Sequence, residues 1–164
     1  MQTRRLTRDA MLTSVALIIF VIEAQLPPLT SIPGIRMGLA NIITVYAVFA
    51  VGAADAAVIL AARILLGTIF AGSLSTLMYS AAGGCLCLLA MLALKRVLTE
   101  RQMWAASVIG AAAHNAGQIA VAVAVTGTIG LLAYLPVLLA SGMTAGLFTG
   151  LCAQALTKRI GGRR

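Results

Sequence analysis

The sequence predicts an all-α fold: a polytopic membrane protein built as a six-transmembrane-helix bundle, with both termini cytoplasmic. Three observations predict it. Of the 164 residues, 61% are hydrophobic and only 10% are charged, whereas about a quarter of the residues in a soluble domain are charged. The apolar residues form six segments, most of them close to the roughly 20 residues that a helix needs to cross a bilayer. The basic residues gather in short clusters between long apolar segments, which is typical of membrane proteins.

Prolines, glycines and turn residues separate the six segments, which we expect to form a single transmembrane domain over residues 1–164. The expected helices span about residues 9–26, 37–51, 55–70, 74–94, 103–125 and 131–156. Pro27 and Pro28 end the first helix because a proline ring is not tolerated in a helix interior, and Gly52 marks the end of the second. Asp55 is interpreted as the N-cap of the third helix. Residues 71–73 and 126–130 are breaks rich in turn-forming residues.

The charge distribution supports the same number of helices. The three basic clusters are Arg4, Arg5 and Arg8, then Lys95, Arg96 and Arg101, and then Lys158, Arg159, Arg163 and Arg164. All three lie on the cytoplasmic side when four helices precede Lys95 and two follow Arg101, whereas five or seven helices place at least one cluster outside. We therefore predict a multi-pass protein of a bacterial-type plasma membrane, in contact with membrane lipid. The net charge of +8 does not indicate nucleic-acid binding, because the basic residues are not spread over one face.

The first basic cluster and the apolar stretch after it also have the order of charge and hydrophobicity found in a signal peptide. Glu23 interrupts the apolar stretch, and Pro27 and Pro28 follow without a clear cleavage site of small residues. We therefore expect residues 9–26 to be retained as the first helix.

A few polar residues lie inside the expected helices, where lipid makes them costly and therefore candidates for function. They are Glu23, Asn41, Arg63, His114, Asn115 and Gln118. With a rise of about 1.5 Å per residue, polar groups on four helices share one depth band, which predicts a central pocket that leans outward. We assign binding of a small-molecule solute to Arg36, Asn41, His114, Asn115 and Gln118, with Glu23 and Arg63 in support. The alternative is that the polar groups only join helices, and that Arg63 and Glu23 form a buried ion pair.

Two features of this set point to a ligand. His114 and Gln118 are four residues apart and share a helix face, and Asn115 and Gln118 are i, i+3 neighbours. The hydrogen-bond donors and acceptors of these side chains are therefore expected to lie along one face of the helix. Arg36 is the only basic residue expected on the outer side, where its charge would attract an anionic or carboxylate-bearing ligand. The alternative for Arg36 is a solvated loop charge.

Small residues predict close helix packing. Gly142, Gly146 and Gly150 repeat at every fourth position of the last expected helix and form a flat face for a neighbouring helix. Ala10 and Ser14 form a weaker face of the same kind on the first helix, which either packs inside the bundle or receives a partner membrane subunit.

Features of catalytic and metal-binding proteins are absent from the sequence. There is no Walker A loop, so the chain does not hydrolyse nucleotide by itself. The only acids are Asp9, Glu23, Asp55 and Glu100, and no two are adjacent, whereas polyprenyl diphosphate synthases hold magnesium with paired aspartate-rich motifs. The three cysteines provide neither a disulfide framework nor the spacing of zinc ligands. We predict no enzyme activity, no metal and no cofactor.

The same residues resemble the signature of the Gx transporter family, which is often labelled heptaprenyl diphosphate synthase component I. Residues 33–41, PGIRMGLAN, resemble the PGI-(K/R)-x-GLAN motif of that family. Residues 63–67, RILLG, and 110–118, GAAAHNAGQ, resemble its next two blocks, and residues 134–138, YLPVL, with the three spaced glycines resemble its last helix. The blocks follow in order over nearly the whole chain.

The resemblance implies a relation to the substrate-binding S components of energy-coupling factor transporters. Those components are six-helix bundles that capture a vitamin-like solute, and a transmembrane coupling subunit with two ATPase subunits drives them. The leading hypothesis is therefore a membrane subunit that takes up a small vitamin-like or anionic solute. The second hypothesis is a non-catalytic membrane component of an isoprenoid, heptaprenyl diphosphate or quinone-related system. The third is a scaffold subunit whose polar residues only hold helices together.

Overall fold

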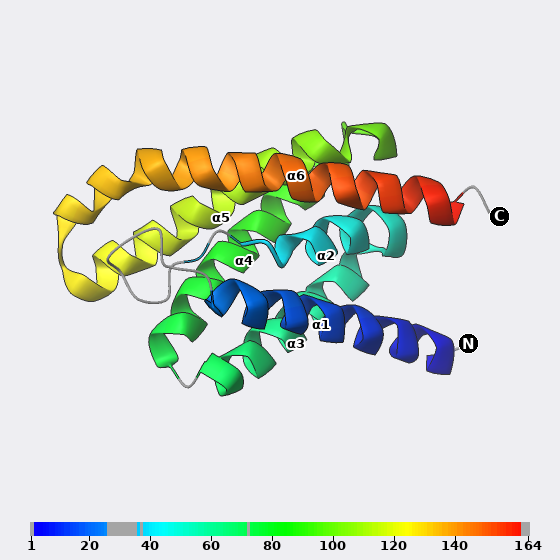
Figure 1. Ribbon diagram of the computed structural model, residues 1–164, viewed down its shortest axis with the longest axis horizontal. Coiled ribbons are helices and arrows are strands. Elements are labelled where there is room, and N and C mark those ends of the chain that lie inside the picture. The colour runs from blue at the N-terminus through cyan, green and yellow to red at the C-terminus, as the bar shows by residue number, and fades with distance from the viewer. Residues whose placement is uncertain (1, 26–35, 37, 72, 162–164) are drawn as a thin grey trace.

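The computed structural model describes residues 2–25, 36, 38–71 and 73–161. Every regular element in these residues is helical, which confirms the all-α prediction. Six α-helices form one bundle (Figure 1). They are α1 (Gln2–Gln25), α2 (Asn41–Tyr46), α3 (Ala53–Ala71), α4 (Leu74–Leu94), α5 (Met103–Thr126) and α6 (Leu135–Gly161). A π-helical turn, η1 (Ala47–Val51), continues α2, and the 3₁₀ turns η2 (Glu100–Gln102) and η3 (Ile129–Tyr134) precede α5 and α6.

Four of the helical segments are long and apolar enough to cross a membrane, which supports a multi-pass membrane protein. They are Ala53–Phe70, Leu74–Leu94, Glu100–Thr126 and Ile129–Arg159. The shorter apolar segment Asn41–Val51, formed by α2 and η1, spans only about 16 Å at the rise of an α-helix, half the thickness of the hydrocarbon layer. That α1 and α2 also cross the membrane stays a prediction.

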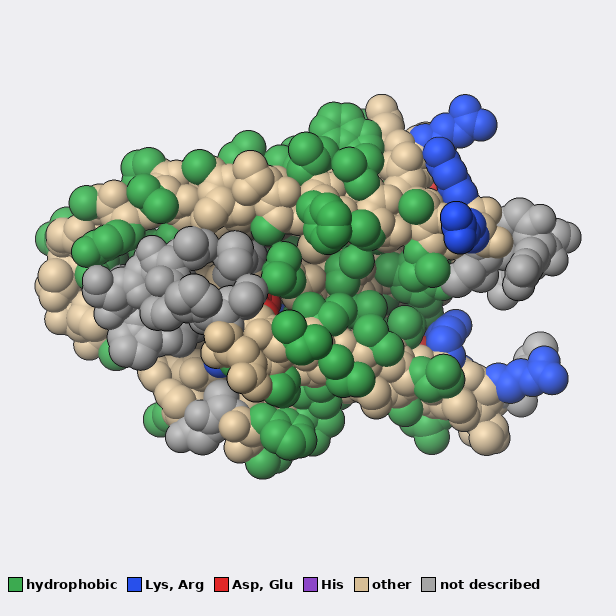
Figure 2. Space-filling view, viewed as in Figure 1, with side chains coloured by type: hydrophobic (Ala, Val, Ile, Leu, Met, Phe, Trp, Pro, Cys, Tyr) green, Lys and Arg blue, Asp and Glu red, His purple; other side chains and the backbone are tan. Residues whose placement is uncertain are grey.

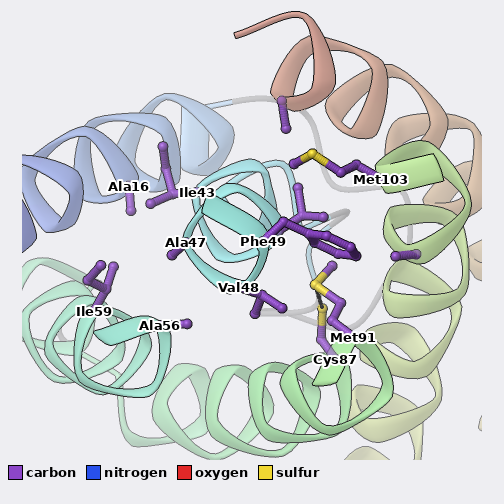
Figure 3. Close-up of a cluster of buried hydrophobic side chains, with 13 residues drawn as sticks. Ala16, Ile43, Ala47, Val48, Phe49, Ala56, Ile59, Cys87, Met91 and Met103 are labelled. Carbon is purple, nitrogen blue, oxygen red and sulfur yellow. Dashed lines mark hydrogen bonds between the residues drawn. The ribbon is translucent and has the colours of Figure 1, made fainter. Parts of the chain in front are cut away.

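The short helix α2 lies at the centre of the bundle and packs against each of the other five α-helices. The longer helices surround it in chain order, with α1 against α3, α3 against α4, α4 against α5, and α5 against α6. Side chains of α2 and η1 fill the middle of the main hydrophobic cluster, among them Ile43, Val48 and Phe49 (Figure 3). Nearly all of α2 is therefore buried, and its polar residues face other helices rather than lipid.

The boundaries of α2 follow from two glycines with positive φ. Gly38 has φ +80°, a left-handed conformation that other residues rarely adopt. The chain turns there, so α2 begins at Asn41, and the expected start at residue 37 is wrong. Gly52, with φ 149°, ends η1. Inside this π-helical turn the carbonyl of Val48 accepts a hydrogen bond from the Lys95 side chain.

Three other expected boundaries also differ from the structure. α1 begins at Gln2 rather than near Asp9, because no glycine or proline interrupts residues 2–8. α3 begins at Ala53, so Asp55 lies in its first turn and is not its N-cap. The last segment begins as the 3₁₀ turn η3, and the α-helix itself starts only at Leu135 and continues to Gly161.

The glycines of α6 face α5 at close range. A Cβ atom on Gly146 would lie 2.9 Å from the Ala111 Cβ, and one on Gly150 would lie 2.6 Å from the Trp104 Cα. Such distances leave no room for a side chain, so these glycines allow the two backbones to approach. In the same contact between α5 and α6, the hydroxyl oxygens of Ser107 and Thr149 are 3.1 Å apart.

The chain ends marked in Figure 1 lie at one end of the bundle, and Lys and Arg side chains gather at that end (Figure 2). The described basic residues at the start of α1, between α4 and α5 and at the end of α6 are Arg4, Arg5, Arg8, Lys95, Arg96, Arg101, Lys158 and Arg159, while Arg163 and Arg164 lie outside the described residues. We call this the basic end, and the opposite end the far end. The basic clusters that were expected to share one side of the membrane thus share one end of the bundle, and the cytoplasmic assignment of that end stays a prediction.

Candidate functional site

The polar residues predicted for the site come together in the middle and far half of the bundle. Glu23, Asn41, Arg63, His114, Asn115 and Gln118 are each at most 5% exposed, whereas Arg36 is half-buried. All except Asn115 form a group that we call the polar cluster: Glu23, Arg36, Asn41, Arg63, His114 and Gln118. The cluster joins α1, α2, α3, α5 and the segment before α2.

Glu23 holds the segment that leads into α2. Its two carboxylate oxygens accept hydrogen bonds from the backbone N–H groups of Gly38, at 2.6 Å, and Leu39, at 3.0 Å. Bonds from N–H groups to an ionised carboxylate are among the stronger hydrogen bonds in proteins. Glu23 therefore fixes the position at which the chain turns into the central helix.

The ring of Phe20 lies near both arginines. The Arg36 guanidinium stacks 4.0 Å from the ring centroid and donates a hydrogen bond of 3.2 Å to the Phe20 carbonyl. The Arg63 guanidinium lies 5.8 Å from the same centroid. Burial lowers the pKa of Arg36 from its ordinary value, and the charge of Glu23 opposes this effect. An arginine nevertheless stays protonated in proteins. Two positive charges therefore lie close to the same aromatic ring.

Gln118 connects α5 to the same segment. Its Oε1 accepts a hydrogen bond of 3.3 Å from the Arg36 backbone N–H, so its Nε2 faces His114 Nε2 at 3.0 Å. An amide nitrogen only donates, and therefore His114 Nε2 accepts and the proton of the neutral ring is on Nδ1. This Nδ1 has no hydrogen-bond partner in the described part of the chain.

Two glycines enclose the His114 ring. A Cβ atom on Gly83 of α4 would lie 2.9 Å from His114 Nδ1, and one on Gly38 would lie 3.2 Å from His114 Cδ2. The ring is thus held between α4 and the turn before α2. The geometry favours a positioning role for His114, which orients Gln118 and supports Gly38.

Asn41 is the polar residue of the cluster with the most unused hydrogen-bonding capacity. It is 3% exposed, and neither its Nδ2 nor its Oδ1 has a partner among the described residues. A Cβ atom on Gly38 would lie 2.7 Å from this Nδ2. A buried donor and a buried acceptor are therefore held side by side, close to Gly38 and His114.

Asn115 does not join this group. Its Nδ2 donates a hydrogen bond to the carbonyl of Leu138 in α6, and Gly142 provides the space for its amide. We expected His114, Asn115 and Gln118 to line one face of their helix. This is wrong for Asn115, because its side chain lies in the contact between α5 and α6.

A cavity of about 270 Å³ opens beside the cluster at the far end of α1. Its described lining residues are Phe20, Val21, Ala24, Gln25, Arg36 and Phe70. The walls are mostly apolar, and the Arg36 side chain supplies a positive charge. Ligand pockets typically combine such apolar walls with few polar groups, at volumes of about 300–1,000 Å³.

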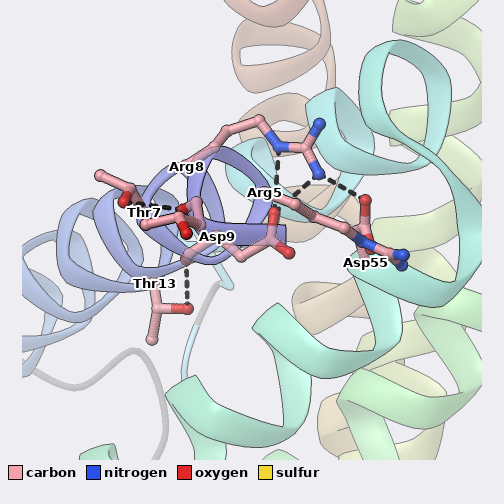
Figure 4. A network of polar contacts seen from close by, with 7 residues as sticks. Arg5, Thr7, Arg8, Asp9, Thr13 and Asp55 are labelled. Atoms are coloured by element: carbon pink, nitrogen blue, oxygen red, sulfur yellow. Dashed lines mark hydrogen bonds and ion pairs between the residues drawn. The ribbon is translucent and has the colours of Figure 1, made fainter. Parts of the chain in front are cut away.

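An ion-pair network at the basic end was not predicted from the sequence. Arg5 and Arg8 of α1 both bind the carboxylate of Asp55 in α3, and Arg8 also pairs with Asp9 at 2.9 Å (Figure 4). The i, i+3 spacing of Arg5 and Arg8 indicates a shared face, but nothing local in the sequence identifies Asp55 as their partner. The network joins the first two turns of α1 to the first turn of α3.

Sequence reasoning also missed Phe20, Gly38 and Gly83 as parts of the site. Phe20 and Glu23 are i, i+3 neighbours, so their common face was a usable signal for Phe20. The glycine contacts depend on helices that are distant in the sequence. Ala10 and Ser14 are exposed on the outer side of α1.

Comparison with known proteins gives a match to a protein family. The chain matches the model of a family described as heptaprenyl diphosphate synthase component I over residues 12–156. This segment contains every residue of the polar cluster. No curated protein and no solved structure matches the chain.

Proposed function

The chain belongs to the heptaprenyl diphosphate synthase component I family, and we propose that it is the membrane subunit of a transport system that binds a small vitamin-like or anionic solute inside the bilayer. A separate transmembrane coupling subunit with ATPase subunits would supply the energy, as in the energy-coupling factor transporters that the motifs resemble. The family description names a component, which fits a protein that works with partner subunits.

The observation that carries this proposal is the buried side-chain amide of Asn41. Both polar atoms of its amide are buried and have no partner in the described structure. Each buried, unpaired polar group costs about 1–3 kcal/mol, and in lipid no water can satisfy it. A bound solute with its own donor and acceptor would supply both missing partners.

The other residues of the cluster would shape the binding site around Asn41. Gln118 holds the Arg36 backbone, and His114 orients Gln118. The Arg36 side chain borders the cavity at the far end, where its charge would attract an anionic solute. Asn115 is assigned to helix packing, since its amide already donates to α6.

The exposed face of α1 at Ala10 and Ser14 fits a partner membrane subunit. Both residues are small and exposed, and Ser14 directs its hydroxyl back to the Ala10 carbonyl at 2.9 Å. Such a face allows another helix to approach closely. A bulky residue there, Ala10→Leu, is expected to weaken co-purification of a coupling subunit and to leave solute binding unchanged.

The proposal is tested by native mass spectrometry of the protein purified in mild detergent. Wild-type protein is expected to retain a stoichiometric water-soluble compound, and Asn41→Leu to lose it. Gln102→Leu is the matched control, because Gln102 is exposed at the basic end. If wild-type protein holds no soluble compound, or Asn41→Leu retains it in full, the proposed function or its site is wrong.

A second candidate function is a non-catalytic membrane partner in an isoprenoid system. The cavity beside Arg36 favours it, because Phe20, Val21 and Phe70 offer an apolar surface next to a positive charge. A prenyl chain would lie on that surface, with its diphosphate on Arg36. Extraction of the same purified protein distinguishes the two candidates, since a polyprenyl diphosphate or quinone supports this one and a soluble compound supports the first.

A further inference from the structure

The charges of the polar cluster do not balance. In formal charges at pH 7, Arg36 and Arg63 contribute two positive charges and Glu23 one negative charge, with His114 counted as neutral. The three other acidic residues lie near the basic end: Asp9 in the second turn of α1, beside Arg8, Asp55 in the first turn of α3 and Glu100 at the start of η2. All four acidic residues of the chain are described, so Glu23 is the only carboxylate side chain in this half of the bundle. The cluster therefore carries one net positive charge.

Arg63 is a buried charge that forms no ion pair with the described residues. It is 4% exposed, and its Nη2 forms no hydrogen bond in the described structure. Every ion pair of the described residues is at the basic end, and the Glu23 oxygens are already used by the backbone of Gly38 and Leu39. The Arg36 guanidinium lies near the same Phe20 ring as that of Arg63, so the two positive charges repel each other.

Arg36 differs from Arg63 in its burial and its hydrogen bonding. Its guanidinium is half-buried, donates to the Phe20 carbonyl and stacks on the Phe20 ring. Its charge is therefore partly stabilised within the protein.

From this imbalance we infer that the solute carries a single net negative charge, and that Arg63 receives its anionic group, a carboxylate. This inference rests on the proposed function and specifies its substrate class. An unpaired charge buried at membrane depth is costly, and a monoanion would neutralise the cluster. A carboxylate matches the two parallel donors of a guanidinium, while Asn41 would bind a neutral hydrogen-bonding group of the same molecule.

The net charge also separates the two candidate functions. A diphosphate carries two or more negative charges, so its binding here would exchange an excess positive charge for an excess negative one. A monocarboxylate leaves no net charge. The cluster thus favours a small carboxylate over an isoprenoid diphosphate.

The first test identifies what the protein retains when Arg63 is changed. Bound compounds are extracted from purified wild-type, Arg63→Met and Arg63→Lys protein and analysed by mass spectrometry. Wild-type protein is expected to hold a compound that is a monoanion at pH 7. Occupancy is expected to fall at least about tenfold in Arg63→Met, equivalent to one decade of affinity, and to be partly restored in Arg63→Lys. A neutral or cationic compound, or full occupancy of Arg63→Met, overturns the inference and leaves the proposed function intact.

The second test needs no ligand. After removal of bound compounds by extensive washing, Arg63→Met is expected to unfold at a higher temperature than wild-type, because it removes an uncompensated buried charge. Arg36→Met is the matched control and is expected to unfold at a lower temperature, because it loses the contacts with Phe20. A lower midpoint for Arg63→Met overturns the inference, since it shows that the charge is compensated within the protein. Wild-type protein without any bound small molecule overturns the proposed function and, with it, this inference.

Discussion

The backbone N–H of Gly38 donates a hydrogen bond of 2.6 Å to the carboxylate of Glu23, fifteen residues earlier in the chain. The neighbouring N–H of Leu39 donates to the second oxygen of the same carboxylate. A buried acidic side chain of α1 thereby holds the turn before the central helix. This contact links the first helix to the segment that carries Asn41.

Replacing Glu23 by Gln is expected to destabilise the protein by about 2 kcal/mol, because one backbone N–H loses its acceptor and faces the new NH₂ group. For a chain of this size, that loss lowers the midpoint of thermal unfolding in detergent by about 4–8 °C. Glu100→Gln is the control, since Glu100 is exposed, and it should change the midpoint very little. Equal midpoints for the two variants would contradict the role assigned to Glu23.

Asn41→Leu is expected to stabilise the empty protein while it abolishes solute retention. Leucine has the same number and branching of side-chain heavy atoms as asparagine, and the change removes two buried polar atoms that have no partner in the described structure. The gain should be about 1 kcal/mol, measured as a higher unfolding midpoint after bound compounds are removed. Asn115→Leu provides the contrast, because it removes the hydrogen bond to the Leu138 carbonyl, and a lower midpoint is expected. A destabilised Asn41→Leu protein would indicate a structural role for the amide.

Gly146→Ala is expected to destabilise the protein by about 1–3 kcal/mol, because the added methyl group would meet the Ala111 Cβ and the Ser107 carbonyl at 2.9 Å. Gly130→Ala is the matched control, since its nearest neighbour would be the Thr128 Cγ2 at 3.9 Å. Unfolding midpoints of both variants test this difference. If Gly146→Ala is as stable as Gly130→Ala, α5 and α6 are not packed as closely as described.

Asp55→Asn is expected to lower the unfolding midpoint at low ionic strength, because it weakens the ion pairs with Arg5 and Arg8. The difference from wild-type should shrink at about 1 M salt, where the screening length is only about 3 Å. The effect should be modest, since the Arg5 and Arg8 side chains are largely in contact with solvent. A difference that is independent of salt would assign Asp55 a role other than ion pairing.

Much of the helical framework is predictable from the sequence because lipid-facing helices need long apolar segments. The expected range 74–94 coincides with α4, Leu74–Leu94, where Ser73 accepts a hydrogen bond from the Thr76 N–H and Lys95 follows the last turn. The start of α2 is not predictable in this way. It depends on the left-handed conformation of Gly38 and on its bond to Glu23 of another helix.

The candidate site is likewise only partly predictable from the sequence. The cost of polar groups in lipid identifies Glu23, Asn41, Arg63, His114 and Gln118 from residue type and position alone. Their individual roles depend on contacts between distant segments. His114 lies between Gly38 and Gly83, and Phe20 lies near both Arg36 and Arg63.

The sequence by itself determined the all-α class, the apolar helices and six of the buried polar residues. Composition and hydrophobic segment length are local properties, and a bilayer imposes them directly on the chain. Only the tertiary structure decided which polar atoms are paired and which are not: Glu23 bonds the turn before α2, Asn115 bonds α6, and Asn41 and Arg63 retain unpartnered atoms among the described residues. Pairing is decided by packing, because it requires donors and acceptors from different helices to meet within about 3 Å.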